Sequence, residues 1–291
     1  MQLSFEKIVF SLVKNLIKIG NKSGNLVIAG GAAMNCVFNG LLNKSKIYKN
    51  NFIPAYPDDL GVSIGAAYLA NNLYSKKKRR IYYEKHNYFG PNYTDIEIKN
   101  ELIKSKIKFS KPHNLTKFVA KKISEGSLIG WFQDSMEFSH RALGNRSILA
   151  DPRNPNMKKI LNKAIKFREG FRPFAPSVLE EHASKIFELN RSDRIYFMEK
   201  IAKVRKNWRN KIPSVTHVDN TARVQTVNKK INSKFYNLIN DFYRITKVPL
   251  LVNTSFNLNG EPIVCSPNDA IRTFYSCGLD ILIIGNYVVE K

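Results

Sequence analysis

Apolar side chains recur every three or four positions over residues 1–20, a spacing typical of an amphipathic helix. A targeting segment would need an unbroken apolar stretch and a small-residue cleavage site. Glu6 and three lysines interrupt this segment, and it lacks such a site. We therefore predict a helix packed on a domain. Its apolar positions are Phe5, Ile8, Val9, Leu12, Leu16 and Ile17.

Two short apolar runs, each followed by a turn and a helical pattern, come next. The first predicted strand covers residues 26–29, Gly30 and Gly31 make a turn, and residues 32–42 are predicted to be helical. A second strand near residues 46–52 leads into an acidic turn and a small-residue helix from Gly61. This alternation of strand and helix predicts an α/β fold.

The second part of the chain contains further predicted elements. A helix at residues 115–124 precedes a strand at 127–133, and buried strands are predicted at 248–253 and 279–285. Between the last two, SPNDAIRTFYS has a clear helix start, with Ser266 as N-cap, Pro267 in the first position and Asp269 in the third.

A change to Tyr- and Asn-rich sequence marks a domain boundary near residues 78–98. We predict a first domain over residues 1–80, a linker over 81–95 and a second domain over 96–291. The linker is preceded by the basic run SKKKRR at residues 75–80, which is typical of a solvated segment.

The composition adds a strong charge bias, because 47 basic against 23 acidic residues give a formal net charge of +24. Such a surface attracts anions, including nucleotides, phosphates and nucleic acid. Lysine, asparagine and isoleucine are abundant throughout, which indicates a general compositional skew. Phosphate-bearing ligands are therefore favoured over a nucleic-acid partner.

The three cysteines, Cys36, Cys265 and Cys277, form no CxxC pair, so the sequence carries no zinc signature. Sparse thiols fit a reducing compartment. No apolar run approaches the length of a membrane span. We therefore expect a cytoplasmic protein without membrane association.

Two turns in the first part of the chain are suited to nucleotide contact. Gly30 and Gly31 follow a strand at a helix start, where the missing Cβ atoms let a phosphate or ribose approach the backbone, and Asn35 would project nearby. Asp58 and Asp59 lie in a turn where a carboxylate suits a metal or a nucleotide hydroxyl. A helix N-cap is the alternative reading of this carboxylate.

Cationic side chains concentrate in two successive loops of the second part. SMEFSHRALGNRSILADPRNP carries Arg141 and Arg146, and KFREGFRPFAPS carries Lys166, Arg168 and Arg172. Guanidinium forks match phosphate oxygens, so this density predicts a phosphate clamp.

Polar side chains also follow the predicted strand at residues 248–253. VNTSFNLNG places Ser255 and Asn257 just after this strand, and THVDNTARVQT supplies Arg223 upstream of it. Hydroxyls and amides at the carboxyl end of a strand are well placed for ligand contact.

Four of these stretches closely resemble the C-terminal part of the NodU/CmcH carbamoyltransferase family: MEFSHRALGNRSILADPR, KFREGFRPFAPSVLEE, THVDNTARVQTV and LLVNTSFNLNGEPIVCSPNDAIRTF. The motifs are long, ordered and correctly spaced, and the resemblance covers essentially the whole chain. That family includes O-carbamoyltransferases acting on nodulation factors, cephalosporins and aminoglycosides.

The resemblance implies an α/β protein with two parts: a remnant of an actin-like ATPase-type domain, and a YrdC-like domain with a mixed, twisted sheet. In the family, the YrdC-like domain is held to join carbamoyl phosphate and ATP into carbamoyl-adenylate, releasing pyrophosphate. The other domain then passes the carbamoyl group to a hydroxyl of the acceptor. The implied cofactors are ATP and Mg²⁺, with Fe²⁺ or another divalent metal at the ATPase-type site.

The resemblance also implies roles for individual residues. YrdC-like proteins carry a K-x-R … S-x-N tetrad, which corresponds here to Lys166, Arg168, Ser255 and Asn257 as catalytic residues. Further expected contacts are Arg141, Arg146, Arg172 and Arg223 for phosphate and carbamoyl phosphate, Gly30, Gly31 and Asn35 for the nucleotide, and Asp59, or alternatively Asp58, for the metal. Within this site, we expect Phe167, Phe171 and Phe174 to wall the pocket rather than to stack on bases.

Family members are longer, and the first phosphate loop, the metal-binding histidine pair and the proposed base of transfer have no counterpart here. We therefore expect one subunit of a split enzyme whose other chain supplies the missing half, or a homo-oligomer. An exposed cut face would leave apolar surface uncovered, which predicts a partner or poor solubility. The alternatives are an inactive fragment or scaffold, and a tRNA-modifying or RNA-binding YrdC-like protein.

Overall fold

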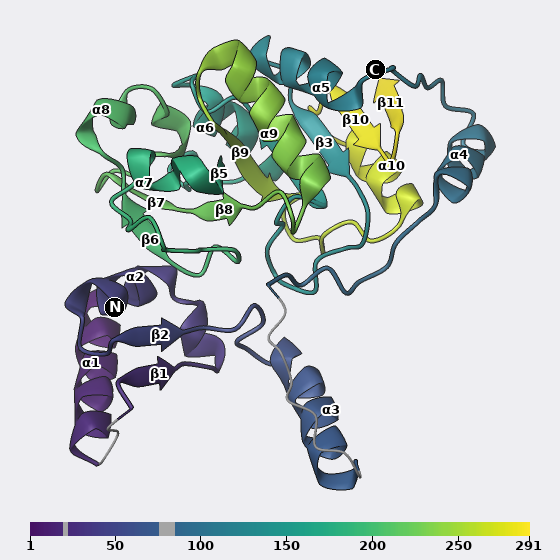
Figure 1. Cartoon of the computed structure of the whole chain (residues 1–291). Coiled ribbons are helices and arrows are strands. Elements are labelled where there is room, and N and C mark those ends of the chain that lie inside the picture. Colours follow the sequence, from purple (N-terminus) through teal and green to yellow (C-terminus); the bar gives the residue numbers. More distant parts are fainter. Residues whose placement is uncertain (20–22, 76–84) are drawn as a thin grey trace. The chain divides into compact units, whose positions relative to one another are not determined.

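The structure, a computed structural model, describes residues 1–19, 23–75 and 85–291 (Figure 1). The chain divides into two compact units. Unit 1 comprises Met1–Glu84 and Glu199–Ile201, and unit 2 comprises Lys85–Met198 and Ala202–Lys291.

Unit 1 alternates helices with two short strands that pair in parallel. Asn25 lies opposite Asn50, and Val27 lies opposite Phe52. This arrangement confirms the strand–helix alternation predicted from the sequence. In chain order the elements are α1 (Gln2–Lys18), β1 (Asn25–Val27), the 3₁₀ helix η1 (Gly31–Met34), α2 (Cys36–Ser45), β2 (Asn50–Phe52) and α3 (Leu60–Tyr74).

An aromatic cluster packs α1 against α2. The rings of Phe5 and Phe10 meet the ring of Phe38 edge-on, at centroid distances of 5.8 and 5.1 Å. Phe38 and Leu42 are buried and lie four residues apart, so both project from the same face of α2. The first helix therefore forms as predicted, and its buried residue is Val13. Its predicted packing face is largely wrong, because four of the six positions are exposed: Ile8, Leu12, Leu16 and Ile17.

The single helix predicted over residues 32–42 is wrong at its start. Asn35 has a ψ of 88°, which ends η1, and its Oδ1 accepts a hydrogen bond from the Phe38 N–H at 3.0 Å as the N-cap of α2. Short amide side chains favour caps because they compete for backbone groups. The strand predicted near residues 46–52 is also shorter, since Lys46 has a φ of +53°.

Unit 2 is built on a seven-stranded mixed sheet with the strand order β11-β10-β3-β4-β9-β5-β8. β10 pairs with β3, and β5 with β8, in parallel, whereas the other neighbours are antiparallel. The mixed sheet agrees with the predicted fold class. Its strands are β3 (Ile129–Phe132), β4 (Arg146–Ala150), β5 (Ala175–Leu179), β8 (Gln225–Val227), β9 (Leu250–Ser255), β10 (Ile281–Ile284) and β11 (Tyr287–Glu290). β6 (Ile201–Lys203) and β7 (Thr221–Arg223) form a separate two-stranded sheet.

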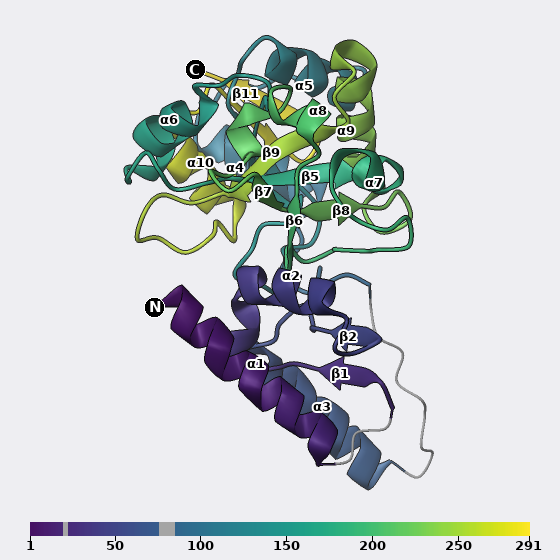
Figure 2. The same ribbon diagram turned by 90° about the vertical axis from the view of Figure 1, so that its left-hand side faces the viewer.

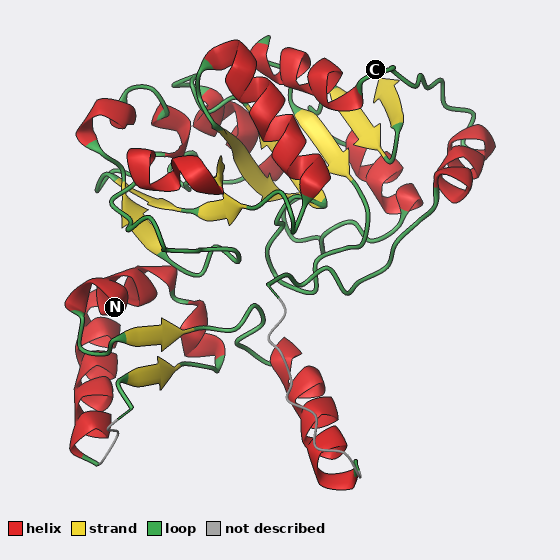
Figure 3. Cartoon of the chain, in the orientation of Figure 1, coloured by secondary structure: helices red, strands yellow, loops and turns green. Residues whose placement is uncertain are grey.

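Two helices, α5 (Leu115–Ser124) and α9 (Ser233–Thr246), lie side by side (Figures 1 and 2). Thr116 Oγ1 on α5 donates to Asp241 Oδ2 on α9 at 2.7 Å. The other α-helices of unit 2, red in Figure 3, are α4 (Asp95–Lys104), α6 (Met157–Leu161), α7 (Ala183–Ile186), α8 (Lys206–Arg209) and α10 (Pro267–Tyr275). Short turns complete the unit: the π-helical η2 (Asn162–Lys166) and the 3₁₀ helices η3 (Glu180–His182) and η4 (Pro213–Val215).

The start of α10 confirms the predicted capping pattern. Ser266 Oγ accepts from the Asp269 N–H at 3.2 Å, and Asp269 Oδ2 accepts from the Ser266 N–H at 2.9 Å. Pro267 occupies the first helical position, where its missing N–H costs nothing. Within the described ranges, no helix is both long enough and apolar enough to span a membrane.

Two segments differ from the predicted domain limits. Asn39 Nδ2 donates to the Glu199 carbonyl at 2.8 Å, and residues 199–201 belong to unit 1. Residues 85–94, predicted as part of the linker, belong to unit 2, where the Phe138 N–H donates to the Asn87 carbonyl at 2.7 Å.

Gly144 allows a test of the packing against α9. Its φ is +112°, and a Cβ there would stand 2.3 Å from the buried Phe235 ring, whereas Gly126 has a φ of +104° and open space. We expect Gly144→Ala to lower the free energy of unfolding by about 1–3 kcal/mol more than Gly126→Ala, because Phe235 must move. Urea unfolding followed by circular dichroism measures both losses. Equal losses would show that the core accommodates the methyl group.

Candidate active site

The Lys166 side chain lies among oxygen atoms from a segment distant in the sequence. Its Nζ donates to the carbonyl oxygen and Oγ of Ser255 at 2.7 and 3.3 Å. It also donates to the carbonyl oxygen and Oδ1 of Asn257 at 2.9 and 2.7 Å. Lys166 ends η2 and Ser255 ends β9, so the structure brings together three residues of the predicted K-x-R … S-x-N tetrad.

Ser255 and Asn257 are also fixed by local hydrogen bonds. Ser255 Oγ donates to Asn257 Oδ1 at 2.6 Å, and Asn257 Nδ2 donates to the Glu261 carbonyl at 2.7 Å. The amide of Asn257 is thereby oriented with its oxygen toward Lys166. The Ser255 hydroxyl directs its proton to an amide oxygen, which is not a base, and this geometry favours an orienting role over a nucleophilic one.

A buried residue that the sequence did not single out, Asn162, positions Arg168. Arg168 Nε donates to Asn162 Oδ1 at 2.7 Å, and Asn162 Nδ2 donates to the Arg172 carbonyl at 3.1 Å. One amide thus organises the loop that carries two of the predicted cations. The signal available in LNKAIK was slight: a buried asparagine needs hydrogen-bond partners, but burial is not visible in the sequence.

The three phenylalanines of this loop occupy different environments. Phe174 is buried, and the Arg168 guanidinium lies 5.0 Å from the centre of its ring. Phe167 and Phe171 are 58% and 78% exposed. The expected pocket wall therefore fits Phe174, whereas the two exposed rings do not have the surroundings of wall residues.

Burial and neighbouring charge perturb the central cations. Burial, followed by the charge of Arg168, lowers the pKa of Lys166 to about 7. Burial, followed by the charge of Arg172, lowers the pKa of Arg168. Arg172 is more exposed and pairs with Glu169 at 3.0 Å. A bound anion would offset the repulsion among these cations, so the site suits phosphate groups.

Arg146 occupies a different environment from the other predicted phosphate contacts. Its side chain is fully buried, and it donates to the carbonyl oxygens of Gln133, Asp134 and Pro91 at 2.5, 3.1 and 3.1 Å. The guanidinium also lies 3.6 Å from the ring centre of Phe132, and burial lowers its pKa to about 10. This geometry favours a structural role for Arg146 over the predicted phosphate contact.

The loop that carries Arg141 is fixed by a buried carboxylate. Glu137 Oε1 accepts from the N–H groups of Leu143 and Asn145 at 2.6 and 2.8 Å, and burial raises the pKa of this carboxyl group. The loop leads into β4, whose Ser147 lies opposite Ser255 in the sheet. The loop that carries half-buried Arg141 therefore ends beside Ser255, at the same end of the strands as the tetrad.

Arg223 ends β7 within an ordered polar segment. His217 Nδ1 lies 3.1 Å from Thr221 Oγ1, which donates to Asp219 Oδ1 at 2.7 Å. Burial lowers the pKa of His217, and the charge of Arg223 acts in the same direction. The phosphate contact of Arg223 stays a prediction.

The predicted nucleotide contacts of unit 1 lie around the η1 turn. Gly30 has a φ of +90°, and Cβ atoms on Gly30 or Gly31 would meet nothing within 4 Å, so this turn is open to a close approach. Asn35 uses its oxygen as the cap of α2, and its Nδ2 donates to Gln2 Oε1 at 2.9 Å. The nucleotide contact of Asn35 stays a prediction.

The predicted metal carboxylates adjoin α3. Asp59 is exposed, occupies the N-cap position and makes no side-chain cap bond, whereas Asp58 is half-buried. Among residues 1–19, 23–75 and 85–291, no three His, Cys, Asp or Glu side chains come together as a metal site. The described residues therefore do not fit a metal ion without further ligands.

Residues 120–291 match the family model "Carbamoyltransferase C-terminus", and residues 1–68 match "Carbamoyltransferase N-terminus". The first match alone covers more than half of the chain. The chain belongs to the NodU/CmcH carbamoyltransferase family.

Curated relatives agree with this membership. The chain is 42% identical over its whole length to Nodulation protein NolNO of Sinorhizobium fredii, of which it covers 43%. It is 39% identical to Nodulation protein NolO of Bradyrhizobium diazoefficiens, of which it covers 54%, again over its whole length. The chain spans about half the length of the curated relatives it matches.

Among solved structures, full-length HypF in the phosphate- and nucleotide-bound form gives a TM-score of 0.39 at 18% identity. The match covers 61% of this chain and 22% of that chain, a likeness too low to bear on the fold. The basic run of the sequence lies, from residue 76 on, outside the described residues.

Lys166→Met tests the charge state of the central lysine. The folded pKa of about 7 lies below the unfolded value, so between about pH 7 and 10 the unfolded state binds more protons than the native state. The free energy of unfolding of the wild type, relative to Lys166→Met, should therefore rise across this range, by up to about 1.4 kcal/mol per pH unit.

Urea unfolding at several pH values measures this slope, with Lys163→Met as the control. Lys163 is an exposed lysine on the same turn, so its replacement should give no such slope. A flat difference for Lys166→Met would mean that the Ser255 and Asn257 oxygens keep Lys166 charged.

Proposed function

We propose that unit 2 activates carbamoyl phosphate with ATP to form carbamoyl-adenylate, and that the carbamoyl group passes to a hydroxyl of a small-molecule or glycan acceptor. The observation that carries this proposal is the convergence of Lys166, Ser255 and Asn257 next to the Arg168 loop. Membership of the carbamoyltransferase family supports it. We propose a cytoplasmic location, where ATP is available.

Atom balance defines the steps that the site must support. Water first removes the phosphoryl group of carbamoyl phosphate as phosphate and leaves carbamate. A carbamate oxygen then attacks the α-phosphorus of ATP, and pyrophosphate leaves with the electron pair of the broken P–O bond. In the transfer step, the acceptor oxygen attacks the carbamoyl carbon, AMP leaves, and the hydroxyl proton is released.

The residues of unit 2 would act through charge and position. Carbamoyl phosphate, carbamate and ATP are all anions and repel one another. The proposed role of Arg141, Arg168 and Arg172 is to hold the phosphate groups of carbamoyl phosphate and ATP and to reduce this repulsion. Lys166 fixes Ser255 and Asn257 and adds its own charge when protonated. Because Asn162 holds Arg168 in place beforehand, little reorganisation is needed during the reaction.

Unit 1 would contribute nucleotide and metal contacts. We propose that Gly30, Gly31 and Asn35 contact the nucleotide, and that ATP carries Mg²⁺ with its phosphates. Asp59 would provide one carboxylate for Fe²⁺ or another divalent metal, whose remaining ligands must come from another polypeptide segment.

Unit 1 also exposes an apolar face on α3, which favours a protein partner. α3 has no buried residue, and Val62, Leu69 and Leu73 on one side of it are 69%, 59% and 65% exposed. Exposed apolar stripes of this kind mark interaction surfaces. We propose that a separate chain, which supplies the N-terminal part of the family, covers α3; a second copy of this chain is the alternative.

ATP–pyrophosphate exchange tests the activation step. We expect labelled pyrophosphate to enter ATP only when carbamoyl phosphate is present. Lys166→Ala and Arg168→Ala should each lower the exchange rate by about 100-fold or more. The first removes the group that fixes Ser255 and Asn257, and the second removes a charge proposed to hold the reacting phosphates. Lys163→Ala is the matched control. Exchange that is indifferent to carbamoyl phosphate, or equal in all variants, would refute the proposal.

Light scattering coupled to gel filtration tests the partner surface. We expect the 33.3 kDa chain to associate or aggregate at lower concentrations than the variant Leu69→Lys/Leu73→Lys, because the variant removes the apolar stripe. Asn71→Lys/Asn72→Lys adds the same charge to exposed positions of α3 and should behave like the wild type. A discrete oligomer of the wild type would identify a second copy as the partner. A wild type as monodisperse as the stripe variant would contradict the proposed surface.

A further inference from the structure

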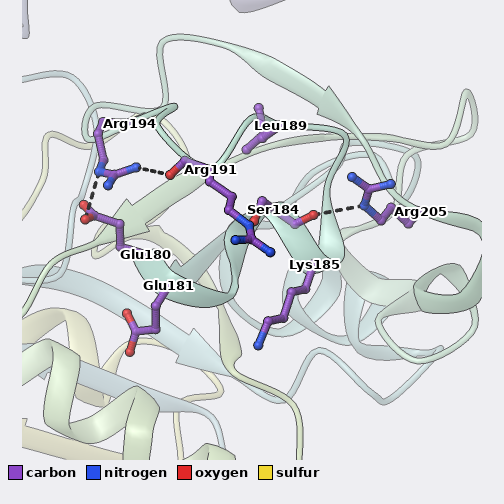
Figure 4. A pocket seen from close by; sticks show the side chains of 8 residues that line it. All are labelled: Glu180, Glu181, Ser184, Lys185, Leu189, Arg191, Arg194 and Arg205. Carbon is purple, nitrogen blue, oxygen red and sulfur yellow. Dashed lines mark hydrogen bonds and ion pairs between the residues drawn. The ribbon is translucent and has the colours of Figure 1, made fainter.

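A second cationic pocket lies at the opposite end of β5 from Lys166. β5 begins at Ala175, just after the Arg168 loop, and ends at Leu179, which leads directly into Glu180. Because a five-residue strand spans about 16 Å, this pocket is separate from the tetrad. Its volume is about 760 Å³, and its charged lining residues are Glu180, Glu181, Lys185, Arg191, Arg194 and Arg205 (Figure 4).

The two carboxylates of the pocket are engaged by other side chains. Glu180 accepts from Arg194 Nε at 2.8 Å, from the Tyr196 hydroxyl at 2.9 Å and from Asn228 Nδ2 at 3.0 Å. Glu181 accepts from the hydroxyl of Tyr236. Glu180 is therefore fully occupied in holding the wall of the pocket, and it neutralises Arg194 alone.

Three cations of the pocket keep donors that no acceptor within residues 1–19, 23–75 and 85–291 uses. Lys185 and Arg191 form no side-chain hydrogen bond or ion pair with the part of the chain that the structure describes. Among the residues that the structure describes, the Arg205 side chain donates only through Nε, to the Ser184 carbonyl at 3.0 Å, so its terminal nitrogens are open to a ligand. Figure 4 shows Arg191 extending across the pocket toward the side formed by Ser184 and Lys185.

We propose that this pocket binds a phosphate-bearing small molecule, with the phosphate on Arg191, Arg205 and Lys185. Two guanidinium forks and an ammonium match the oxygens of a phosphate dianion. The volume falls within the range of about 300–1,000 Å³ typical of ligand sites and exceeds what a bare phosphate needs. An organic group therefore fits beside the phosphate.

The position of the pocket in the sheet supports the same conclusion. β5 and β8 pair in parallel, with Leu179 opposite Val227, so their carboxyl ends meet at this edge. Ligands in α/β sheets bind preferentially beyond the carboxyl ends of parallel strands. This site is independent of the proposed carbamoyl activation, whose residues lie at the amino end of β5.

Isothermal titration calorimetry at constant ionic strength tests the pocket, with glucose 6-phosphate as the ester probe, inorganic phosphate as the bare anion and glucose as the uncharged control. We expect both anions to bind, the ester more tightly, and Arg191→Gln/Arg205→Gln to weaken each by about tenfold or more. Arg244→Gln/Arg272→Gln removes the same charge from two exposed arginines elsewhere and should leave binding unchanged.

The outcomes distinguish this site from general attraction and from the tetrad. Equal weakening in the two double variants would mean that the net charge of +24 alone attracts the anions, which overturns the proposal. Binding that survives in Arg191→Gln/Arg205→Gln but disappears in Lys166→Ala/Arg168→Ala would assign the anion to the tetrad and also overturn it. Binding that persists in Lys166→Ala/Arg168→Ala and is lost in Arg191→Gln/Arg205→Gln supports the pocket, whether or not carbamoyl activation is observed. Tighter binding of bare phosphate than of the ester would refute the organic part.

Discussion

The buried ammonium of Lys166 constrains the arrangement of unit 2 around the candidate site. A charge removed from water is costly unless oxygen atoms surround it, and here they come from Ser255 and Asn257. The end of η2 must therefore meet the end of β9. β9 is paired on both sides, with Ser147 of β4 opposite Ser255 and Ala175 of β5 opposite Asn253. The loops that carry Arg141 and Arg168 adjoin these strands and therefore lie at the same end of β4, β9 and β5.

The local elements were largely readable from the sequence, because they follow from nearest-neighbour chemistry. The amphipathic first helix, the cap of α10 at Ser266 and the buried strands depend on spacing and residue type alone. The break at Asn35 was missed, since an asparagine in an apolar run is compatible with either a helix interior or a cap. In the fold, its side chain caps α2 because its Oδ1 lies within hydrogen-bonding distance of the Phe38 N–H.

The site could be predicted in part from the sequence. The sequence does not show which arginines are buried in the fold and which remain accessible to a ligand. The resemblance to the NodU/CmcH family implied Lys166, Ser255 and Asn257 as site residues, and the fold does bring them together. Sequence density alone could not separate Arg168 from Arg146, whose guanidinium is taken up by backbone carbonyls. Asn162 was invisible for the same reason: its role depends on contacts that only the folded loop makes. The second pocket likewise gathers cations that the sequence scatters over separate segments.

The uncharged amide of Asn162 holds the loop that carries Arg168 and Arg172. Its oxygen holds Arg168 and its nitrogen holds the Arg172 carbonyl, so both ends of the amide are needed. An aspartate would match this side chain in shape but would forfeit the nitrogen donor and set a negative charge against Arg168. Conversion of this single amide into an acid, a change that also occurs spontaneously as proteins age, would thus weaken the local attraction for anions.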